Sequence, residues 1–255
     1  MTKRVRIDRL LVERGLFESR AKAQEAIAAG MVTADGTAVT KPAEAVSADA
    51  VLQATPAHPW VSRGGLKLVA ALDHFGIDPR GRICLDVGAS TGGFTQVLLA
   101  RGARRVYAVD GGRGQLHASL HGHPGVVGIE ATDIRKLEPA RLERPPDLIT
   151  VDVSFIPLKL VLPAALALAG PAAQAATQEP AQVPSQAIVL IKPQYEAGPA
   201  HVKKGLVRDP AVHAQVCVAA TSLVESLGWT VLGVIPSPIA GGDGNHEFLM
   251  AAQQG

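Results

Sequence analysis

Residues 83–99 read ICLDVGASTGGFTQVLL, and they decide which fold the remaining sequence predicts. Ile83–Leu85 is a short apolar run typical of a buried strand, and Asp86 stands where that strand ends. Three glycines follow within six residues, and they let the backbone turn sharply and approach a ligand closely. Apolar residues then recur at helical spacing. The stretch predicts the first strand–turn–helix unit of a nucleotide-binding α/β sheet, with free N–H groups at the helix start for an anion.

The spacing of the turn narrows the choice of ligand. Ser90 replaces the second glycine of the dinucleotide pattern G-x-G-x-x-G. D-x-G-x-x-x-G-G instead resembles motif I of S-adenosylmethionine (SAM) methyltransferases, in which the acid reaches the methionine part of the ligand. The same letters also spell the hydrolase elbow G-x-S-x-G, but this is the first predicted strand and no HGGG-type segment precedes it. The resemblance implies a SAM site that includes Asp86, Gly88, Ser90, Gly92 and Gly93.

Length and composition set outer limits on fold and function. A chain of 255 residues has room for one large and one small domain. The net charge of +2 means that any affinity for nucleic acid must come from local basic clusters. Cys84 and Cys217 lie in apolar runs, which predicts buried thiols in a reducing compartment. No apolar run reaches the roughly 18 residues of a membrane span, and no signal-peptide core follows the basic N-terminus, so we expect a cytoplasmic protein.

Residues 1–55 are predicted to form a small domain of their own. The first 25 residues hold seven basic and four acidic side chains, which on charge alone is most simply a solvated helix surface. However, residues 6–11 (RIDRLL), 19–23 (SRAKA) and 27–32 (IAAGMV), followed by an Asp-Gly turn, resemble an S4 domain, a small RNA-binding fold. The resemblance implies phosphate contacts that position RNA without reading its sequence. The residues implied are Arg6, Arg9, Arg20 and Lys22.

The rest of the chain is predicted to be a linker, 56–62, and a second domain, 63–255. The linker holds two prolines, and its Trp60 either packs on a domain, the favoured interpretation, or stacks on a base. Strands alternating with helices predict a doubly wound, mostly parallel, seven-stranded α/β sheet, which is a Rossmann-like fold. Residues 170–186, rich in Ala, Pro and Gln, are expected to be a flexible insertion. The strands are predicted at 83–85, 105–109, 126–129, 148–151, 187–191, 229–235 and 248–251.

Acidic residues after the second and third strands complete the predicted cofactor site. The carboxylate of Asp110 suits the two ribose hydroxyls of an adenosine, because it accepts two hydrogen bonds side by side. Methyltransferases of this class commonly use the position of Asp133 to contact the adenine amino group. Asp133 is equally well placed to cap the next turn, and the sequence leaves the two roles open.

The segment after the fourth strand bears on the methyl acceptor. Enzymes that methylate exocyclic amines resemble one another in carrying N-P-P-Y or D-P-P-Y here, whereas this chain has Asp-Val-Ser-Phe at 152–155. Enzymes that methylate pyrimidine C5 need a cysteine after a proline, and neither Cys84 nor Cys217 follows one. An acceptor oxygen is therefore favoured.

Four polar residues are predicted to converge at the ligand edge of the sheet: Lys67, Asp152, Lys192 and Glu247. Their order resembles the catalytic tetrad of FtsJ-like ribose 2′-O-methyltransferases. With the S4-like segment and the stretches SRGGLKL, DVGASTGGFT, DVSFIPL, IKPQYE and NHEFL, nearly the whole chain is similar to the hemolysin A (TlyA) family. The resemblance implies a ribosomal RNA cytidine-2′-O-methyltransferase that uses SAM and binds ribosomal RNA or ribosomal subunits. We expect no metal ion, no membrane and no DNA among its ligands.

In this interpretation Lys192 is either the base or the group that stabilises a developing alkoxide, and the carboxylates orient the lysines. Burial and a second ammonium lower a lysine pKa, carboxylates raise it, and the balance stays open at this stage. One rival is a membrane-lysing haemolysin, which no amphipathic or strongly cationic stretch supports. Another is a non-catalytic S4 protein on ribosomes, which the complete tetrad disfavours. The target nucleotide, its subunit and the oligomeric state are not predicted.

Overall fold

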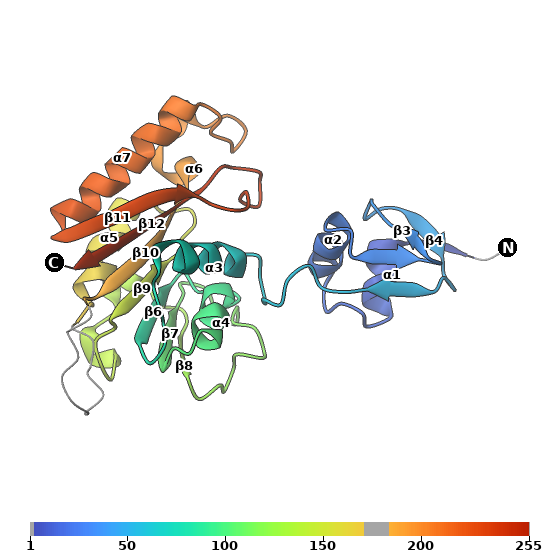
Figure 1. Cartoon of the computed structure of the whole chain (residues 1–255), viewed down its shortest axis with the longest axis horizontal. Helices are drawn as coiled ribbons and strands as arrows, with labels where there is room; N and C mark the ends of the chain where they lie inside the picture. Colours follow the sequence, from blue (N-terminus) through green and yellow to red (C-terminus); the bar gives the residue numbers. More distant parts are fainter. Residues whose placement is uncertain (1–2, 171–183, 255) are drawn as a thin grey trace. The chain divides into compact units, whose positions relative to one another are not determined.

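The structure, a computed structural model, describes residues 3–170 and 184–254 (Figure 1). The chain divides into two compact units, Met1–Pro59 and Trp60–Gly255. Most of the predicted insertion, residues 171–183, lies outside the described residues. Gln186, its last predicted residue, already belongs to a strand.

The first unit packs two helices against short strands around one apolar core. Ser19 accepts a hydrogen bond from the Lys22 N–H and so caps the start of α2. The Asp-Gly turn noted in the sequence joins β2 and β3, and Asp35 and Gly36 both have positive φ, 50° and 75°, as a type I′ hairpin turn requires. The elements are β1 (Arg4–Arg6), α1 (Ile7–Glu13), α2 (Arg20–Ala28), β2 (Val32–Ala34), β3 (Thr37–Ala38), β4 (Ala45–Ser47) and β5 (Leu52–Ala54).

The second unit is built on a seven-stranded sheet in the order β11-β12-β10-β9-β6-β7-β8. β12 runs antiparallel to both of its neighbours, and the other pairings are parallel, so the predicted mostly parallel sheet is confirmed. The strands are β6 (Ile83–Val87), β7 (Arg105–Val109), β8 (Val126–Ile129), β9 (Leu148–Val151), β10 (Gln186–Ile191), β11 (Trp229–Pro236) and β12 (Phe248–Gln254).

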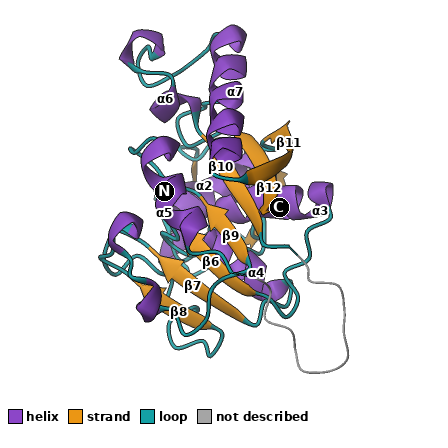
Figure 2. Cartoon of the chain, turned by 90° about the vertical axis from the view of Figure 1, so that its left-hand side faces the viewer, coloured by secondary structure: helices purple, strands orange, loops and turns teal. Residues whose placement is uncertain are grey.

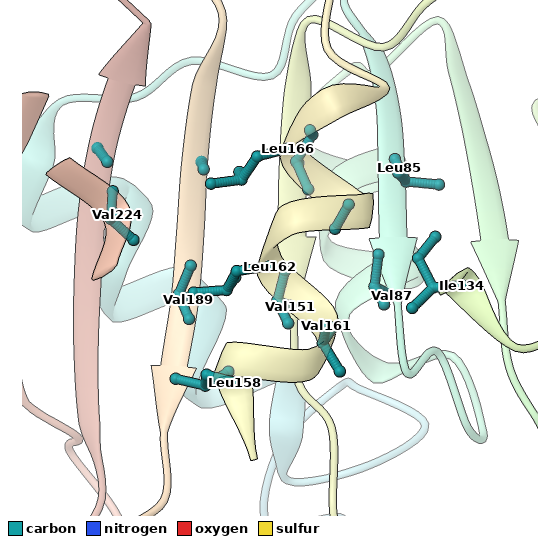
Figure 3. Packing of buried hydrophobic residues seen from close by; sticks show 14 of the residues in the cluster. Leu85, Val87, Ile134, Val151, Leu158, Val161, Leu162, Leu166, Val189 and Val224 are labelled. Atoms are coloured by element: carbon teal, nitrogen blue, oxygen red, sulfur yellow. The ribbon is translucent and has the colours of Figure 1, made fainter. Parts of the chain in front are cut away.

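Helices cover both faces of this sheet (Figures 1 and 2). Alternating strand residues face opposite layers: Leu85 packs with α5 and α7, whereas Cys84 packs with α3 and α4. Figure 3 shows Leu158, Leu162 and Leu166 of α5 lying on the sheet. The helices are α3 (Gly64–Phe75), α4 (Gly93–Ala100), α5 (Leu158–Ala167), α6 (Pro193–Glu196) and α7 (Pro210–Ser226), with single 3₁₀ turns η1 (Ile134–Lys136), η2 (Pro139–Arg141) and η3 (Pro199–His201).

Two further features of the second unit answer sequence-based expectations. Trp60 is partly buried and packs against the core beneath α3 and α4, and a Cβ on Gly65 would lie 2.5 Å from its ring, so packing is its role in this structure. Among residues 3–170 and 184–254, no helix has the length and apolar character needed to cross a membrane.

Candidate active site

A cavity of about 720 Å³ opens at the carboxyl ends of β6, β7 and β9. The order of the strands reverses beside β6, because β7 and β8 lie on one side of it and β9 and β10 on the other. Open α/β sheets bind ligands at such switch points, and this volume is typical of small-molecule sites. Four of the seven predicted cofactor residues line the cavity: Gly88, Ser90, Asp110 and Asp133.

The glycine turn after β6 brings the backbone to the cavity wall. Gly88 has a φ of +82°, and a Cβ there would lie 2.2 Å from the carbonyl oxygen of Asp152, so only glycine fits. Gly92 and Gly93 do not line the cavity. A Cβ on either would collide with a neighbouring side chain, so these two glycines allow α4 to pack at the turn.

Asp86, which the sequence placed among the ligand contacts, is fully buried within β6 and does not line the cavity. Its carboxylate accepts hydrogen bonds from the hydroxyls of Thr95 (2.6 Å) and Thr150 (3.0 Å). Burial raises the pKa of Asp86 to about 6, although both hydroxyls favour the charged form. In this structure Asp86 therefore ties β6, α4 and β9 together beneath the glycine turn.

Asp110 faces the cavity and also holds two loops. Its carboxylate accepts the N–H groups of Ser90 (2.8 Å) and Gly112 (2.7 Å), one on each oxygen. A carboxylate oxygen has two lone pairs, so each oxygen keeps one for a ligand hydroxyl. The arrangement links the glycine turn to the loop after β7.

Asp133 caps the turn that follows it and also lies where it could contact a ligand, the two roles that the sequence left open. It caps η1 by accepting the Arg135 N–H at 3.0 Å, and it also lines the cavity. The guanidinium of Arg135 pairs with the same carboxylate and lowers the pKa of Asp133 to about 2. Asp133 is therefore ionised at neutral pH.

The structure joins the four predicted tetrad residues into two ion pairs. Lys67 Nζ lies 2.5 Å from Glu247 Oε2, and Lys192 Nζ lies 2.6 Å from Asp152 Oδ1. Asp152 and Lys192 follow the adjacent parallel strands β9 and β10, and Glu247 precedes β12, the other neighbour of β10. All four therefore lie at the same edge of the sheet as the cavity.

The two pairs differ in their surroundings. The side chains of Lys67 and Glu247 are 10% and 3% exposed, whereas those of Lys192 and Asp152 are 10% and 20% exposed. Lys192 also donates a hydrogen bond to Ser154 Oγ at 2.9 Å. Asp152 and Ser154 line the cavity, so the Lys192 ammonium contacts two residues of the cavity wall.

Phe155 is a cavity residue whose position sequence reasoning missed. Its side chain is 88% exposed, and its ring centroid lies 5.2 Å from that of Tyr195. Its φ is +65°, and Ser90 and Ala131 on the cavity wall are also left-handed, at +47° and +51°. Non-glycine residues in this region are strained, and such strain gathers at functional sites. Nothing in the sequence signals these backbone angles.

The first unit holds two of the predicted RNA-binding arginines in place. The fully buried carboxylate of Asp8 accepts hydrogen bonds from Arg6 (3.0 Å) and Arg20 (2.7 Å), and their side chains stay 42% and 48% exposed. The Arg6 guanidinium holds the pKa of Asp8 far below its usual range. Arg9 is exposed and Lys22 half-buried. Sequence reasoning missed Asp8, which fixes the direction of both arginines.

Within the described ranges, no three His, Cys, Asp or Glu side chains gather in a way that would hold a metal ion. The site consists of a cavity lined by the glycine turn and by the carboxylates of Asp110, Asp133 and Asp152, and the two lysine–carboxylate pairs lie at the same edge of the sheet.

Comparison with known proteins agrees with this arrangement. Residues 60–254 match the FtsJ-like methyltransferase family and residues 5–52 the S4 domain. The 16S/23S rRNA (cytidine-2′-O)-methyltransferase TlyA of Mycobacterium tuberculosis is 45% identical over 253 residues, 98% of this chain and 90% of its own. Hemolysin A of Brachyspira hyodysenteriae is 35% identical, over 96% of this chain and 98% of its own.

Solved structures agree as well. A putative hemolysin from Streptococcus thermophilus superposes with a TM-score of 0.75 at 37% identity, over 100% of this chain and 90% of its own. These matches span both units of the chain. The chain belongs to the TlyA/hemolysin A family, whose members join an S4 domain to an FtsJ-like methyltransferase domain.

Proposed function

We propose that this chain transfers a methyl group from SAM to a ribose 2′-hydroxyl of ribosomal RNA, on a cytidine. The observation that carries the proposal is the pairing of Lys192 with Asp152 on the wall of a cavity at the switch point of the sheet. The name of the Mycobacterium tuberculosis relative, at 45% identity, supports both the reaction and the nucleoside. Because the proposed substrate is ribosomal RNA, we infer that the protein acts in the cytoplasm.

The cavity residues suit SAM. Gly88 lets the turn after β6 pass close to the Asp152 carbonyl at the cavity wall. Asp110 keeps a free lone pair on each oxygen for ribose hydroxyls. Asp133 is an ionised acceptor for an adenine amino group. Asp86, Gly92 and Gly93 support the site from beneath by shaping the glycine turn. SAM supplies a methyl group already activated by its sulfonium.

The tetrad performs the remaining chemistry. A ribose hydroxyl is a weak acid, so the enzyme must align its oxygen with the methyl group and remove the proton that this oxygen loses. Lys192 takes up that proton as a neutral amine, or as an ammonium it stabilises the developing alkoxide while the proton passes to solvent. Lys192 meets the acceptor oxygen, because its ammonium already contacts the cavity wall through Asp152 and Ser154. Lys67 and Glu247 form the more enclosed pair and join α3 to the start of β12, the strand beside the one that Lys192 follows.

RNA is held at two places in this proposal. The S4 domain binds backbone phosphates through Arg6, Arg9, Arg20 and Lys22. Asp8 orients Arg6 and Arg20 by accepting hydrogen bonds from both. The exposed ring of Phe155, at the cavity mouth, offers a face on which an unpaired base can stack.

Alkaline digestion tests the reaction. Alkali cleaves RNA through attack by the 2′-oxygen, so a methyl group on that oxygen leaves an uncut dinucleotide. We expect ribosomal subunits incubated with methyl-labelled SAM and the protein to yield label in dinucleotides that contain cytidine. Label in mononucleotides would mean base methylation and would refute the proposed acceptor. Absence of transfer by a protein that binds both SAM and RNA would favour the non-catalytic S4 protein instead.

A further inference from the structure

A turn with three basic side chains lies outside the residues assigned so far. It is residues 201–208, HVKKGLVR, between α6 and α7, and we name it the basic turn. Lys203, Lys204 and Arg208 are exposed, and among the described residues none of them forms an ion pair. Arg101 and Arg135, which are also exposed, instead pair with Asp73 and Asp133.

The backbone of the basic turn is well defined. Lys203 and Leu206 exchange both N–H···O=C bonds, at 2.9 and 3.0 Å. Lys204 and Gly205 between them have φ of +51° and +79°, the geometry of a two-residue type I′ turn. The two lysines are therefore presented from a rigid hairpin.

Asn245 ties this hairpin to the tetrad. The Asn245 side chain is almost fully buried; its Oδ1 accepts the Val207 N–H at 3.1 Å and its Nδ2 donates to the Gly205 carbonyl at 2.8 Å. Asn245 stands two residues before Glu247, which pairs with Lys67. Whatever binds the basic turn is thus held at a fixed place relative to the tetrad.

The chemistry of the basic turn favours a polyanion of regular spacing. None of its apolar side chains is exposed, whereas a protein interface or a membrane-binding surface would combine charge with apolar contact. Asp209, the residue after the basic turn, caps α7 by accepting the Ala211 N–H. Asp243, also exposed, stands two residues before Asn245. Cations without apolar neighbours are typical of contacts to nucleic-acid phosphates.

We propose that the basic turn is an RNA-binding surface of the methyltransferase unit, where Lys203, Lys204 and Arg208 hold backbone phosphates beside the nucleotide presented to the tetrad. The inference rests on the proposed function and adds to it a phosphate contact outside the S4 domain. Its physical consequence is that part of the salt dependence of RNA binding originates in the second unit.

The test uses the full chain with Lys203→Gln and Lys204→Asn together, since asparagine tolerates the left-handed backbone of position 204. Arg80→Gln with Arg104→Gln is the matched control: both arginines are exposed and precede β6 and β7, at the opposite edge of the sheet. Affinity for purified ribosomal subunits is measured from about 50 to about 200 mM KCl.

We expect the lysine variant to lower the slope of log affinity against log salt by roughly 1.4–1.8, because each lost phosphate contact removes about 0.7–0.9 of a released counterion. KM for subunits should rise about tenfold while SAM affinity stays unchanged, and adding Arg208→Gln should lower the slope further. The control should keep the wild-type slope.

Equal slopes for the lysine variant and wild type would overturn the inference, and so would an equal loss of slope in the control. A change in affinity without a change in slope would also overturn it, because phosphate contacts must release counterions. Failure of the proposed function is a separate result: wild-type protein would then leave no alkali-resistant label, whatever the slopes are.

Discussion

The two lysine–carboxylate pairs share chemistry and a sheet edge but differ in what they face. Lys67 and Glu247 are enclosed by protein, and neither lines the cavity. Lys192 pairs with Asp152, which is 20% exposed and forms part of the cavity wall. The carboxylates of the predicted cofactor site differ in the same way, since Asp86 is fully buried whereas Asp110 lines the cavity. Enclosed groups should mainly affect stability, and wall groups binding and transfer.

The largest effect on stability should follow Lys67→Ala. This change leaves the buried carboxylate of Glu247 without its cation, which costs about 3–5 kcal/mol of unfolding free energy. Lys192→Ala should cost less, because the side chain of Asp152 is 20% exposed and that of Glu247 only 3%. Urea unfolding followed by tryptophan fluorescence measures this in the second unit, which holds both Trp60 and Trp229.

A matched double variant separates charge from packing in that result. Lys67→Met with Glu247→Gln removes both charges and should recover most of the stability lost by Lys67→Ala. Equal destabilisation by Lys67→Ala and Lys192→Ala would remove the distinction between an enclosed and an exposed pair.

Asp86→Asn should show how a buried carboxylate makes the stability of the protein depend on pH. The pKa of Asp86 is about 6 in the folded protein and ordinarily 3.8, so between pH 4 and 6 the unfolded chain loses this proton first. The wild type therefore loses stability as pH rises through this window, by about 3 kcal/mol in total, and the asparagine variant does not. The advantage of Asp86→Asn should grow by that amount from about pH 4 to pH 7.

Urea unfolding at the two pH values measures the Asp86 effect, with the exposed Asp243→Asn as a control that should show no such trend. A constant difference between wild type and Asp86→Asn would mean that the buried carboxylate does not titrate in this window.

Asp110→Ala should have the smallest effect of these changes, and the quantity that it changes is the affinity for SAM. Losing hydrogen bonds to the ribose costs roughly 1.5–3 kcal/mol, which weakens binding by about tenfold or more. Calorimetric titration of SAM measures it, with Asp110→Asn expected to retain part of the affinity. Unchanged SAM affinity in Asp110→Ala would take Asp110 out of the cofactor site.

Much of the fold was predictable because local patterns and chain topology agree. Glycine turns and apolar runs marked the parallel strands within two residues, with β8 and β9 matching at both ends, whereas β12 ends three residues later than predicted. The insertion of β12 between β10 and β11 was not predictable, because pairing between distant strands leaves no local signal. The last two strands, β11 and β12, do pair with each other.

The candidate site divides in the same way. Lys67, Asp152, Lys192 and Glu247 were predicted to converge because strand ends and helix starts meet at one sheet edge. Which lysine pairs with which carboxylate, and which pair faces the cavity, depends on side-chain packing that the sequence does not display. The same holds for the burial of Asp86.

Single-turnover transfer from methyl-labelled SAM to ribosomal subunits, with both ligands saturating, tests the central claim most directly. Lys192→Ala should bind SAM and subunits normally yet transfer the methyl group at least about 100-fold more slowly, since it removes the group that meets the acceptor oxygen. The control is the exposed Lys159→Ala on α5, which should keep the wild-type rate. Transfer by Lys192→Ala at the wild-type rate would contradict the assignment of Lys192 as the residue at the reacting oxygen.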